Sequence, residues 1–374
     1  MIHMPDNFAS EVPKLGFGLM RLPRKGLLID DEQVSEMVDL FMDAGFTYFD
    51  TAFVYPGSEA AIKKALVDRY PRDSYTLCTK LNASLMGATE KSTRQQLETS
   101  LQRTGAGYFD YYLLHALMEN NYHKYDRFKL WDFIKEQKDA GLIKRFGFSF
   151  HASPDLLEKL LNEHPEVDFV QLQINYADWE NPSVASRANY EVARRHGKPI
   201  TVMEPVKGGT LANPPQEVKN LFKAHHPDMS CASWAIRFVA SLEGIVTVLS
   251  GMSNIEQMMD NLSYMKDFKP LDEDEQKIIQ QAQRILGHSS TIACTGCGYC
   301  LKGCPMQINI PGIFKAMNKQ LGNGLAQEAS ESYFKAAPEC HRASNCIGCR
   351  SCERSCPQHL EIIKNLEKAW KMFE

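Results

Sequence analysis

The sequence predicts an α/β protein in which a closed (β/α)8 barrel, a TIM barrel, precedes a small cysteine-rich domain. Short runs of β-branched and aromatic residues alternate with helical periodicity over roughly 260 residues, and such alternation is typical of a parallel sheet. About eight strand–helix units of this length fit a closed barrel better than an open doubly wound sheet. Nine of the eleven cysteines lie between Cys294 and Cys356. We therefore expect a barrel domain at residues 1–270, and a connecting helix with the cysteine-rich domain at residues 271–374.

The strand and helix patterns of a barrel follow one another along the chain. A strand or hairpin opens it at residues 14–22. The later strands are expected at residues 46–49, 75–79, 109–114, 143–149, 167–174, 199–203 and 244–249. The helices are expected at residues 31–42, 61–67, 89–101, 128–140, 154–161, 183–196, 216–221, 230–239 and 255–268, with a connector at 269–286. An open sheet is the alternative, but Gly16-Phe-Gly18 lacks the third glycine of the dinucleotide-binding motif that would favour it.

Composition and charge are those of an ordinary globular chain and argue against several function classes. Of the 374 residues, 44% are hydrophobic and 24% are charged, and the net charge of −4 gives no reason to expect nucleic acid or an anionic membrane as a partner. No apolar run approaches the ~18 residues of a membrane-spanning helix. Residues 1–7 are polar and lack the apolar core of a signal peptide. The sequence therefore predicts a cytoplasmic protein.

The cysteines form an internal repeat. Cys294-x2-Cys297-x2-Cys300-x3-Cys304-Pro305 is matched by Cys346-x2-Cys349-x2-Cys352-x3-Cys356-Pro357. This is the spacing of bacterial two-cluster ferredoxins, in which three cysteines of one run and the last cysteine of the other ligate one [4Fe–4S] cluster. One cluster is therefore expected on Cys294, Cys297, Cys300 and Cys356, and the other on Cys346, Cys349, Cys352 and Cys304. The fourth cysteine of each run is expected to begin a helix that points away from the loop.

Zinc is the alternative occupant of these cysteines. Paired Cys-x2-Cys units also bind zinc, but two four-cysteine runs that both end in Cys-Pro disfavour it. Cys340 fits no ligand position, whereas Cys78 and Cys231 lie in apolar runs and are expected to be buried. Few large apolar residues lie between Thr291 and Gln358, so the clusters are also expected to hold this domain together.

Four polar residues lie at or near the ends of predicted strands. Asp50, Lys80 and His115 each close a strand, with the 30- and 35-residue spacing of strand–helix units, and Tyr55 follows five residues after the first. Taken singly, Asp50 could cap a helix, Lys80 could form an ion pair with Asp50, and His115 could be a buried histidine with its hydrogen bonds satisfied. Active sites of such barrels lie at the carboxyl ends of the strands, so we expect the four side chains to meet. A tyrosine, with a pKa of about 10, is a poor acid at neutral pH. A neighbouring ammonium favours its ionised form and a carboxylate holds the ammonium in place, which suits protonation of a carbonyl oxygen.

The sequence resembles the aldo-keto reductases over nearly the whole predicted barrel. The motifs that carry the resemblance are Phe49-Asp-Thr-Ala-x-x-Tyr55, Thr79-Lys80, Tyr111-Tyr-Leu-Leu-His115, Gly147-Phe-Ser149, Val170-Gln171 and Gly251-x-Ser253-x-x-x-Gln257-x-x-x-Asn261. The resemblance implies NAD(P)H-dependent reduction of an aldehyde or ketone, or the reverse oxidation of an alcohol. It makes Tyr55 the general acid, tuned by Lys80 and Asp50, and lets His115 orient the substrate carbonyl. The cysteine-rich domain is similar to that of the branch of this family with a C-terminal ferredoxin-type domain.

The resemblance also assigns residues to an extended nicotinamide dinucleotide. Ser149 and Gln171 match positions that hold the carboxamide, and Gln257 and Asn261 match positions near the adenine. Ser253 belongs to the same motif.

Three departures from the family pattern affect the cofactor. Phe150 replaces the asparagine that often follows the serine, and Met203 replaces the aromatic residue that usually stacks on the nicotinamide. Gly251 and Gln257 stand where members that choose NADPH usually present a lysine and an arginine. NADH is therefore expected to serve at least as well as NADPH. Lys207 is the nearest basic candidate for the pyrophosphate, or else a solvated loop lysine.

Two other functions stay open beside a carbonyl reductase with a small-molecule substrate. In one, the ferredoxin-type domain serves a redox partner protein and the barrel is a docking body. In the other, the barrel runs a non-redox reaction on a carbonyl compound. A docking barrel would not need four matched catalytic positions, which argues against the first. Substrate selectivity is expected in the loops at residues 118–124 and 179–183.

Overall fold

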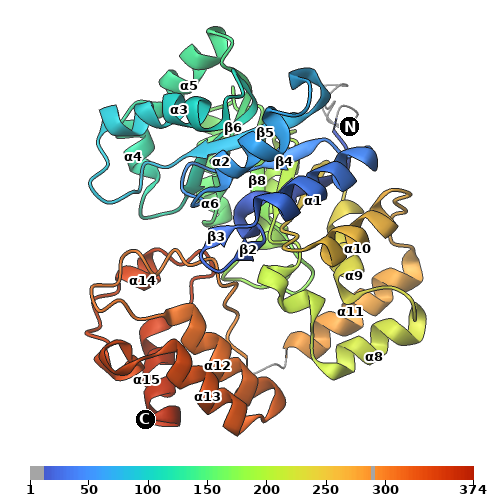
Figure 1. Cartoon of the computed structure of the whole chain (residues 1–374), viewed down its shortest axis with the longest axis vertical. Helices are drawn as coiled ribbons and strands as arrows, with labels where there is room; N and C mark the ends of the chain where they lie inside the picture. The colour runs from blue at the N-terminus through green and yellow to red at the C-terminus, as the bar shows by residue number, and fades with distance from the viewer. Residues whose placement is uncertain (1–11, 288–290) are drawn as a thin grey trace. The chain divides into compact units, whose positions relative to one another are not determined.

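The computed structural model describes residues 12–287 and 291–374 in two compact units (Figure 1). The first unit contains residues 12–180, 185–205 and 232–276, and the second contains residues 181–184, 206–231 and the described residues from 277 to the C-terminus. Residues 1–7, where the sequence shows no signal peptide, lie outside the described residues.

Eight parallel strands close into a barrel in the first unit. They are β1 (Leu15–Gly18), β4 (Tyr48–Asp50), β5 (Thr76–Leu81), β6 (Phe109–Leu117), β7 (Ile143–Phe150), β8 (Phe169–Gln173), β9 (Ile200–Met203) and β10 (Ile245–Ser250). Around the barrel the order is β1-β10-β9-β8-β7-β6-β5-β4, so strands that follow one another along the chain are neighbours in space. The prediction of a (β/α)8 barrel is confirmed, and the open sheet is excluded. A two-stranded hairpin of β2 (Arg24–Lys25) and β3 (Leu28–Ile29) follows the first barrel strand.

The barrel strands are buried on both faces. All nine residues of β6 and all six of β10 are buried, and the parallel register pairs Asp50 with Cys78 and Ser149 with Gln171. Strands covered by helices on one side and packed against each other on the other carry continuous apolar and aromatic runs. These runs made the strands predictable.

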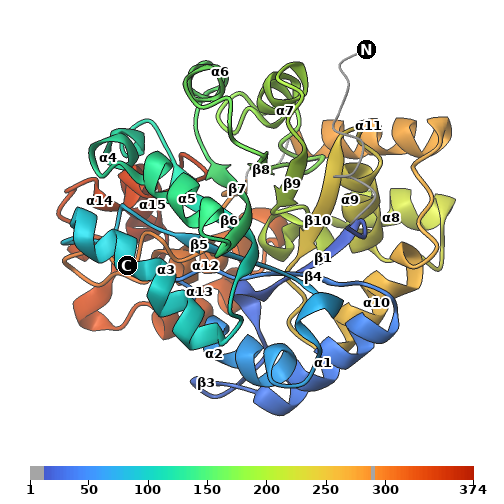
Figure 2. The same ribbon diagram turned by 90° about the horizontal axis from the view of Figure 1, so that it is seen from above.

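Helices lie outside the strands, as the view from above shows (Figure 2). Those of the first unit are α1 (Asp31–Asp43), α2 (Ser58–Ile62), α3 (Glu90–Thr104), α4 (Tyr122–Arg127), α5 (Leu130–Asp139), α6 (Pro154–Glu163), α7 (Ser186–Arg195), α9 (Cys231–Ala240) and α10 (Ile255–Met265). The helix α11 (Glu273–Gly287) runs from this unit into the second. The sequence predicts a loop where α4 lies, because Tyr125 is the one buried residue of this short helix and leaves no periodic apolar pattern.

The second unit is built around α12 (Ile310–Asn323), α13 (Ala326–Ala336) and α15 (Ile362–Phe373), with α8 (Gln216–His225) and the four-residue α14 (Ser351–Arg354). The helix α12 packs against both α13 and α15. The hydrophobic core of the second unit contains Ile308, Ile310, Ile313, Phe314, Met317, Tyr333, Ile362 and Leu366. Helices α12 and α15 thus bring together apolar residues that are scattered along the sequence, including Ile362 and Leu366 beyond Gln358.

Two expectations about cysteines are corrected by the helices. Cys304 and Cys356 do not begin a helix; α12 and α15 start six residues after them, following a turn that contains the proline. Cys231, expected to be buried, is partly exposed at the start of α9, whereas Cys78 is buried as expected. Among the described residues, no helix is both long and apolar enough to cross a membrane.

Candidate functional site

Asp50 and Lys80 form a buried ion pair at the carboxyl ends of β4 and β5. The Nζ of Lys80 donates to Asp50 Oδ1 at 2.6 Å and to the carbonyl oxygen of Thr51 at 2.7 Å. Lys80 is 1% exposed and Asp50 4%. The register pairs Asp50 with Cys78, so Lys80 lies two residues further along its strand and reaches back across the barrel end. A charge this deeply buried is tolerated because it is paired and hydrogen bonded.

Tyr55 and His115 complete the group. Their rings meet edge to face with centroids 5.9 Å apart, and the Nζ of Lys80 lies 5.5 Å from the centroid of the Tyr55 ring. Tyr55 lies in the loop between β4 and α2, where its N–H donates to the carbonyl of Ala52 at 3.0 Å. The structure thus brings together the four residues that the sequence analysis expected to meet. Tyr55 is partly exposed while the other three are buried, so its phenol is the group of the four best placed to touch a ligand.

His115 is held in its neutral form. Burial lowers its pKa well below the usual value, and electrostatic interaction with Lys80 and His151 lowers it further. A neutral imidazole can donate a hydrogen bond to a carbonyl oxygen without carrying charge into the site.

A bulge in β6 sets the backbone beside His115. The pairing of β6 with β7 shifts register between Leu114 and Leu117, and Ala116 takes a left-handed conformation with φ +58°. The N–H of Ala116 donates to Ser149 Oγ at 2.7 Å. Bulges next to active sites re-aim a side chain, and here the bulge follows His115 directly. Ser149 therefore supports the bulge through its oxygen, besides any contact with a carboxamide.

Two residues that the sequence analysis missed also brace the bulge. Asn121 Nδ2 donates to the carbonyl of Ala116 at 2.8 Å, and the hydroxyl of Tyr125 donates to the carbonyl of His115. Asn121 comes from the loop at residues 118–124 that was expected to contact the substrate, and Tyr125 follows that loop directly. Their hydrogen bonds go to backbone atoms, which leave no signal in the sequence.

Gln171 joins the same group from β8. Its Nε2 donates to the second oxygen of Asp50 at 3.4 Å, and it is buried. Met203, at the end of β9, is partly buried. Both lie at the barrel end where the resemblance expects the nicotinamide.

The motif after β10 is ordered by its own hydrogen bonds. Gln257 and Asn254 cap α10: Ser253 N–H donates to Gln257 Oε1 at 2.8 Å, and Gln257 N–H donates to Asn254 Oδ1 at 2.9 Å. The amide of Asn261 donates to the carbonyl of Gln257 at 2.7 Å and accepts from the Ser250 hydroxyl at 3.1 Å. Asn261 is buried, and its side-chain amide already makes these two hydrogen bonds. A contact with adenine would therefore have to use the same amide group.

A cation that the sequence analysis missed lies beside Gly251. A Cβ atom on Gly251 would be 3.7 Å from Cδ of Arg21, the last residue of a 3-10 turn (Leu19–Arg21) after β1. The guanidinium of Arg21 lies 3.7 Å from Oε1 of Glu204, which follows Met203. The sequence predicts an opening strand or hairpin at residues 14–22, which contains Arg21, so the position of Arg21 after β1 is visible only in the structure.

The loop after β9 belongs to the second unit and packs on the first cysteine run. Lys207 is buried with φ +50°, so its interpretation as a solvated loop lysine is wrong. Gly208 has φ +64°, and a Cβ there would lie 2.3 Å from the carbonyl oxygen of Thr295. At this distance no side chain fits, and glycine is required.

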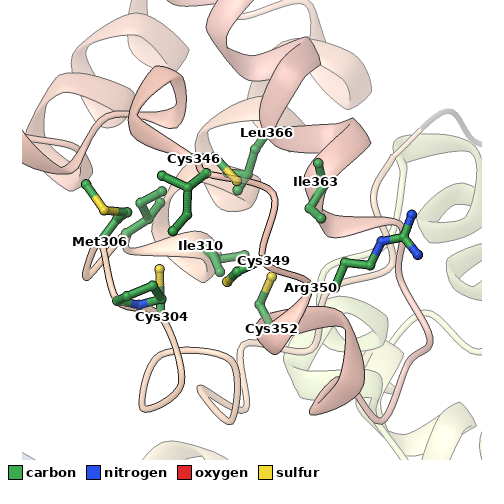
Figure 3. A pocket seen from close by; sticks show the side chains of 12 residues that line it. Cys304, Met306, Ile310, Cys346, Cys349, Arg350, Cys352, Ile363 and Leu366 are labelled. Carbon is green, nitrogen blue, oxygen red and sulfur yellow. The ribbon is translucent and has the colours of Figure 1, made fainter.

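The eight repeated cysteines line two pockets in the second unit. One is lined by Cys294, Cys297, Cys300 and Cys356 with apolar side chains that include Phe314 and Leu360. The other is lined by Cys304, Cys346, Cys349 and Cys352 with Met306, Ile310 and Leu366 among its walls (Figure 3). Each pocket therefore takes three cysteines from one run and the last cysteine of the other run.

The donor sets of these pockets fit iron–sulfur clusters. Within the described residues, no three His, Cys, Asp or Glu side chains converge to hold a single metal ion. Four thiolates around one zinc ion would each lie about 2.3 Å from it, whereas in a four-iron cluster each thiolate bonds a different iron. Burial raises the pKa of Cys300 and Cys356, and that of Cys352 to about 11.

Comparison with known proteins gives two family matches. The model of the aldo/keto reductase family matches residues 14–284, and the model of a 4Fe-4S dicluster domain matches residues 293–363.

Curated relatives match part of the chain. Aldo-keto reductase family 1 member C21 is 30% identical in Rattus norvegicus over 41% of this chain and 52% of that protein, and 32% identical in Mus musculus over 42% and 52%. Aldo-keto reductase str7 of Strobilurus tenacellus is 28% identical over 54% of this chain and 60% of its own. The chain thus spans about half the length of these relatives.

Solved structures share the fold. Aldo-keto reductase AKR11C1 from Bacillus halodurans, in its holo form, has a TM-score of 0.57 at 23% identity, over 72% of this chain and 91% of its own. An aldo/keto reductase from Klebsiella pneumoniae in complex with NADP and acetate has a TM-score of 0.60 at 19% identity, over 74% and 94%. The match over residues 14–284 covers most of the chain, and the four side chains at the barrel end accord with it. The chain therefore belongs to the aldo/keto reductase family, and its barrel is followed by a 4Fe-4S dicluster domain.

Proposed function

We propose that the protein is an NAD(P)H-dependent oxidoreductase that reduces an aldehyde or ketone, or oxidises the alcohol in reverse, with Tyr55 as the general acid. One observation carries the proposal. The ring of Tyr55, a partly exposed residue, lies 5.5 Å from the buried, paired ammonium of Lys80 and 5.9 Å from the ring of the buried His115. Carbonyl reduction needs this combination of a proton donor, a cation to stabilise its phenolate, and a neutral hydrogen-bond donor.

Each side chain has a defined task in this reaction. A reduced nicotinamide bound at this barrel end would supply the hydride for the carbonyl carbon. Tyr55 gives its hydroxyl proton to the carbonyl oxygen, and the ammonium of Lys80 stabilises the phenolate left behind. Asp50 holds the ammonium in place, and His115 orients the carbonyl by donating a hydrogen bond to its oxygen. Solvent then returns the proton to Tyr55.

The resemblance to the family assigns the cofactor residues. Ser149 and Gln171 would hold the carboxamide, Met203 would pack against the nicotinamide ring, and Lys207 would face the pyrophosphate. The adenosine part would lie along the motif formed by Gly251, Ser253, Gln257 and Asn261.

We propose that NADH serves at least as well as NADPH. Gly251 and Gln257 carry no charge, and the cation beside them, Arg21, is paired with Glu204. A 2′-phosphate would have to compete with that carboxylate for the guanidinium, so it gains little binding energy.

The cysteine pockets would bind two [4Fe–4S] clusters, one on Cys294, Cys297, Cys300 and Cys356 and the other on Cys346, Cys349, Cys352 and Cys304. We assign residues 1–270 to the barrel domain and residues 271–374 to the connector and dicluster domain. A cytoplasmic location suits a cysteine set that must stay reduced until iron binds.

The test uses anaerobically purified protein with its clusters intact. NAD(H) and NADP(H) binding is measured by titration, and a panel of aldehydes and ketones is then screened with both reduced cofactors. Binding with substrate-dependent oxidation of the nicotinamide supports the proposal. Absence of nicotinamide binding would favour the electron-transfer reading, and binding without oxidation would favour non-redox carbonyl chemistry.

A further inference from the structure

The two cysteine runs repeat one backbone shape as well as one sequence spacing. Gly296 and Gly348, at equivalent places, both have φ +67°. After the Cys-Pro pairs, Gln307 has φ +52° and His359 has φ +50°. Each residue of the second run can therefore be compared with a structural counterpart in the first.

At one of these equivalent positions the second run has an arginine where the first has a glycine, and the arginine backbone is strained. Gly298 has φ +76°, and its counterpart Arg350 has φ +61°. The left-handed conformation is easy for glycine but strained for a residue with a Cβ. Arg350 is exposed, and within the described residues its guanidinium makes no ion pair or hydrogen bond that would offset the strain. Figure 3 shows its side chain directed away from the four cysteines.

A second place departs in the same loop. Thr295 is 4% exposed in the first run, whereas its counterpart Ile347 is 63% exposed. Cys349, between Ile347 and Arg350, is exposed as well, while its counterpart Cys297 is partly buried. We call Ile347, Cys349 and Arg350 the cluster-two edge. Here one pocket comes close to solvent beside an exposed apolar side chain and a cation.

The second cysteine run carries an excess of positive charge along the sequence. Residues 340–358 contain three arginines, Arg342, Arg350 and Arg354, against one acid, Glu353. The carboxylate of Glu353 is engaged, because it accepts the N–H of Ile363 at 3.0 Å. The first run has Lys302 as its single charged residue between Cys294 and Pro305.

We propose that the cluster-two edge is a docking surface for an acidic one-electron carrier protein. The proposal rests on the cluster assignment made above. One electron would pass per encounter: the reduced carrier loses one electron, and the cluster held by Cys304, Cys346, Cys349 and Cys352 changes from [4Fe–4S]2+ to [4Fe–4S]+, or the reverse. A cation and an exposed apolar residue at one point are what an interface needs for electrostatic steering and a desolvated centre. Contact with an acidic partner would then explain why an arginine occupies this strained position, where it makes no ion pair within the described residues.

The test replaces the edge with the residues of the first run. Arg350→Gly relieves strain, so it should fold, and Ile347→Thr removes the apolar side chain. Lys302→Gly is the matched control, because it removes one exposed charge beside the other cluster. Iron content and the electron paramagnetic resonance of the reduced protein come first. A wild-type protein without two clusters would refute the cluster assignment and this proposal with it.

Electron transfer is then measured by stopped flow on dithionite-reduced protein at low ionic strength. Ferricyanide serves as the anionic oxidant and hexaammineruthenium(III) as the cationic one. Arg350→Gly should slow the anionic reaction by about threefold or more and flatten its dependence on salt, without slowing the cationic reaction. A change in cluster potential would move both reactions the same way, and equal rates for wild type and Arg350→Gly would overturn the proposal.

Binding is measured separately with an acidic plant-type [2Fe–2S] ferredoxin as the protein probe. Both Arg350→Gly and Ile347→Thr should weaken its affinity about fivefold or more, while Lys302→Gly should not. Equal affinities for wild type and the two edge variants would also refute the docking surface.

Discussion

The Nζ of Lys80 lies 2.6 Å from Oδ1 of Asp50 and 5.5 Å from the centroid of the Tyr55 ring. Each is buried so completely that neither can lose its partner without leaving an uncompensated charge inside the barrel. The pair therefore links catalysis to stability, and the two effects can be separated by mutation.

Lys80→Met should abolish reduction and lower the free energy of unfolding by about 3–5 kcal/mol, since it strands the carboxylate of Asp50. Chemical denaturation and turnover are the measurements. Combining it with Asp50→Leu should restore much of the stability but none of the activity. A single variant as stable as wild type would contradict the pairing.

Tyr55→Phe should keep cofactor binding and lose about 10²–10⁴-fold in turnover, because the proton donor is gone while the shape of the site survives. Binding is followed by titration and turnover with the best carbonyl substrate. The assignment fails for a Phe variant that keeps more than half of the wild-type rate.

The lowered pKa of His115 predicts a loss of stability in acid. The unfolded chain binds a proton on this histidine below about pH 6.5, while the folded chain resists it, so the free energy of unfolding falls as pH falls through that range. His115→Gln should flatten this dependence in denaturation curves between pH 7 and 5. Parallel curves for both proteins would show that His115 is not the group responsible.

Wild-type protein should use NADH at least as well as NADPH in kcat/KM. Glu204→Gln should shift the ratio towards NADPH, because it frees Arg21 for the 2′-phosphate, and Arg21→Ala in the same background should reverse the shift. Arg24→Ala, on the nearby hairpin, is the control. A hundredfold wild-type preference for NADPH would refute the expectation.

Hydride transfer should not depend on the redox state of the clusters. Nicotinamide delivers two electrons together, whereas a [4Fe–4S] cluster passes one, and the sequence shows no dinucleotide-binding βαβ motif for a flavin that would convert between them. Protein reduced with dithionite, freed of excess reductant, should turn over carbonyl substrate with NADH at the rate of oxidised protein. A rate that appears in one cluster state alone would make the enzyme electron-coupled.

The barrel and its four central residues could be read from the sequence because their signals are local. Strands such as 109–114 are uninterrupted apolar runs, and Asp50, Lys80 and His115 each mark the place where such a run stops. The spacing of the cysteines is equally local. It therefore predicted which cysteines share a pocket, including the exchange of the fourth cysteine between the two runs.

What the sequence did not reveal depends on distant contacts. The bulge at Ala116 is held by Ser149, 33 residues away, and nothing in the alanine itself suggests a left-handed backbone. Arg21 and Gly251 are separated by most of the barrel and become neighbours because β1 pairs with β10. The core of the second unit likewise joins α12 to α15 across a long cysteine-rich stretch.

Gly208 bears on how far the chain is modular. The loop that follows β9 leaves no room for a side chain against Thr295, so a segment in the middle of the barrel sequence is shaped to fit the first cysteine run. A fragment cut at residue 270 would keep this loop and lose the backbone it was shaped for. The reductase and dicluster portions are thus not independent modules. Replacing either portion with its homologous counterpart would also require redesigning the loop around Gly208.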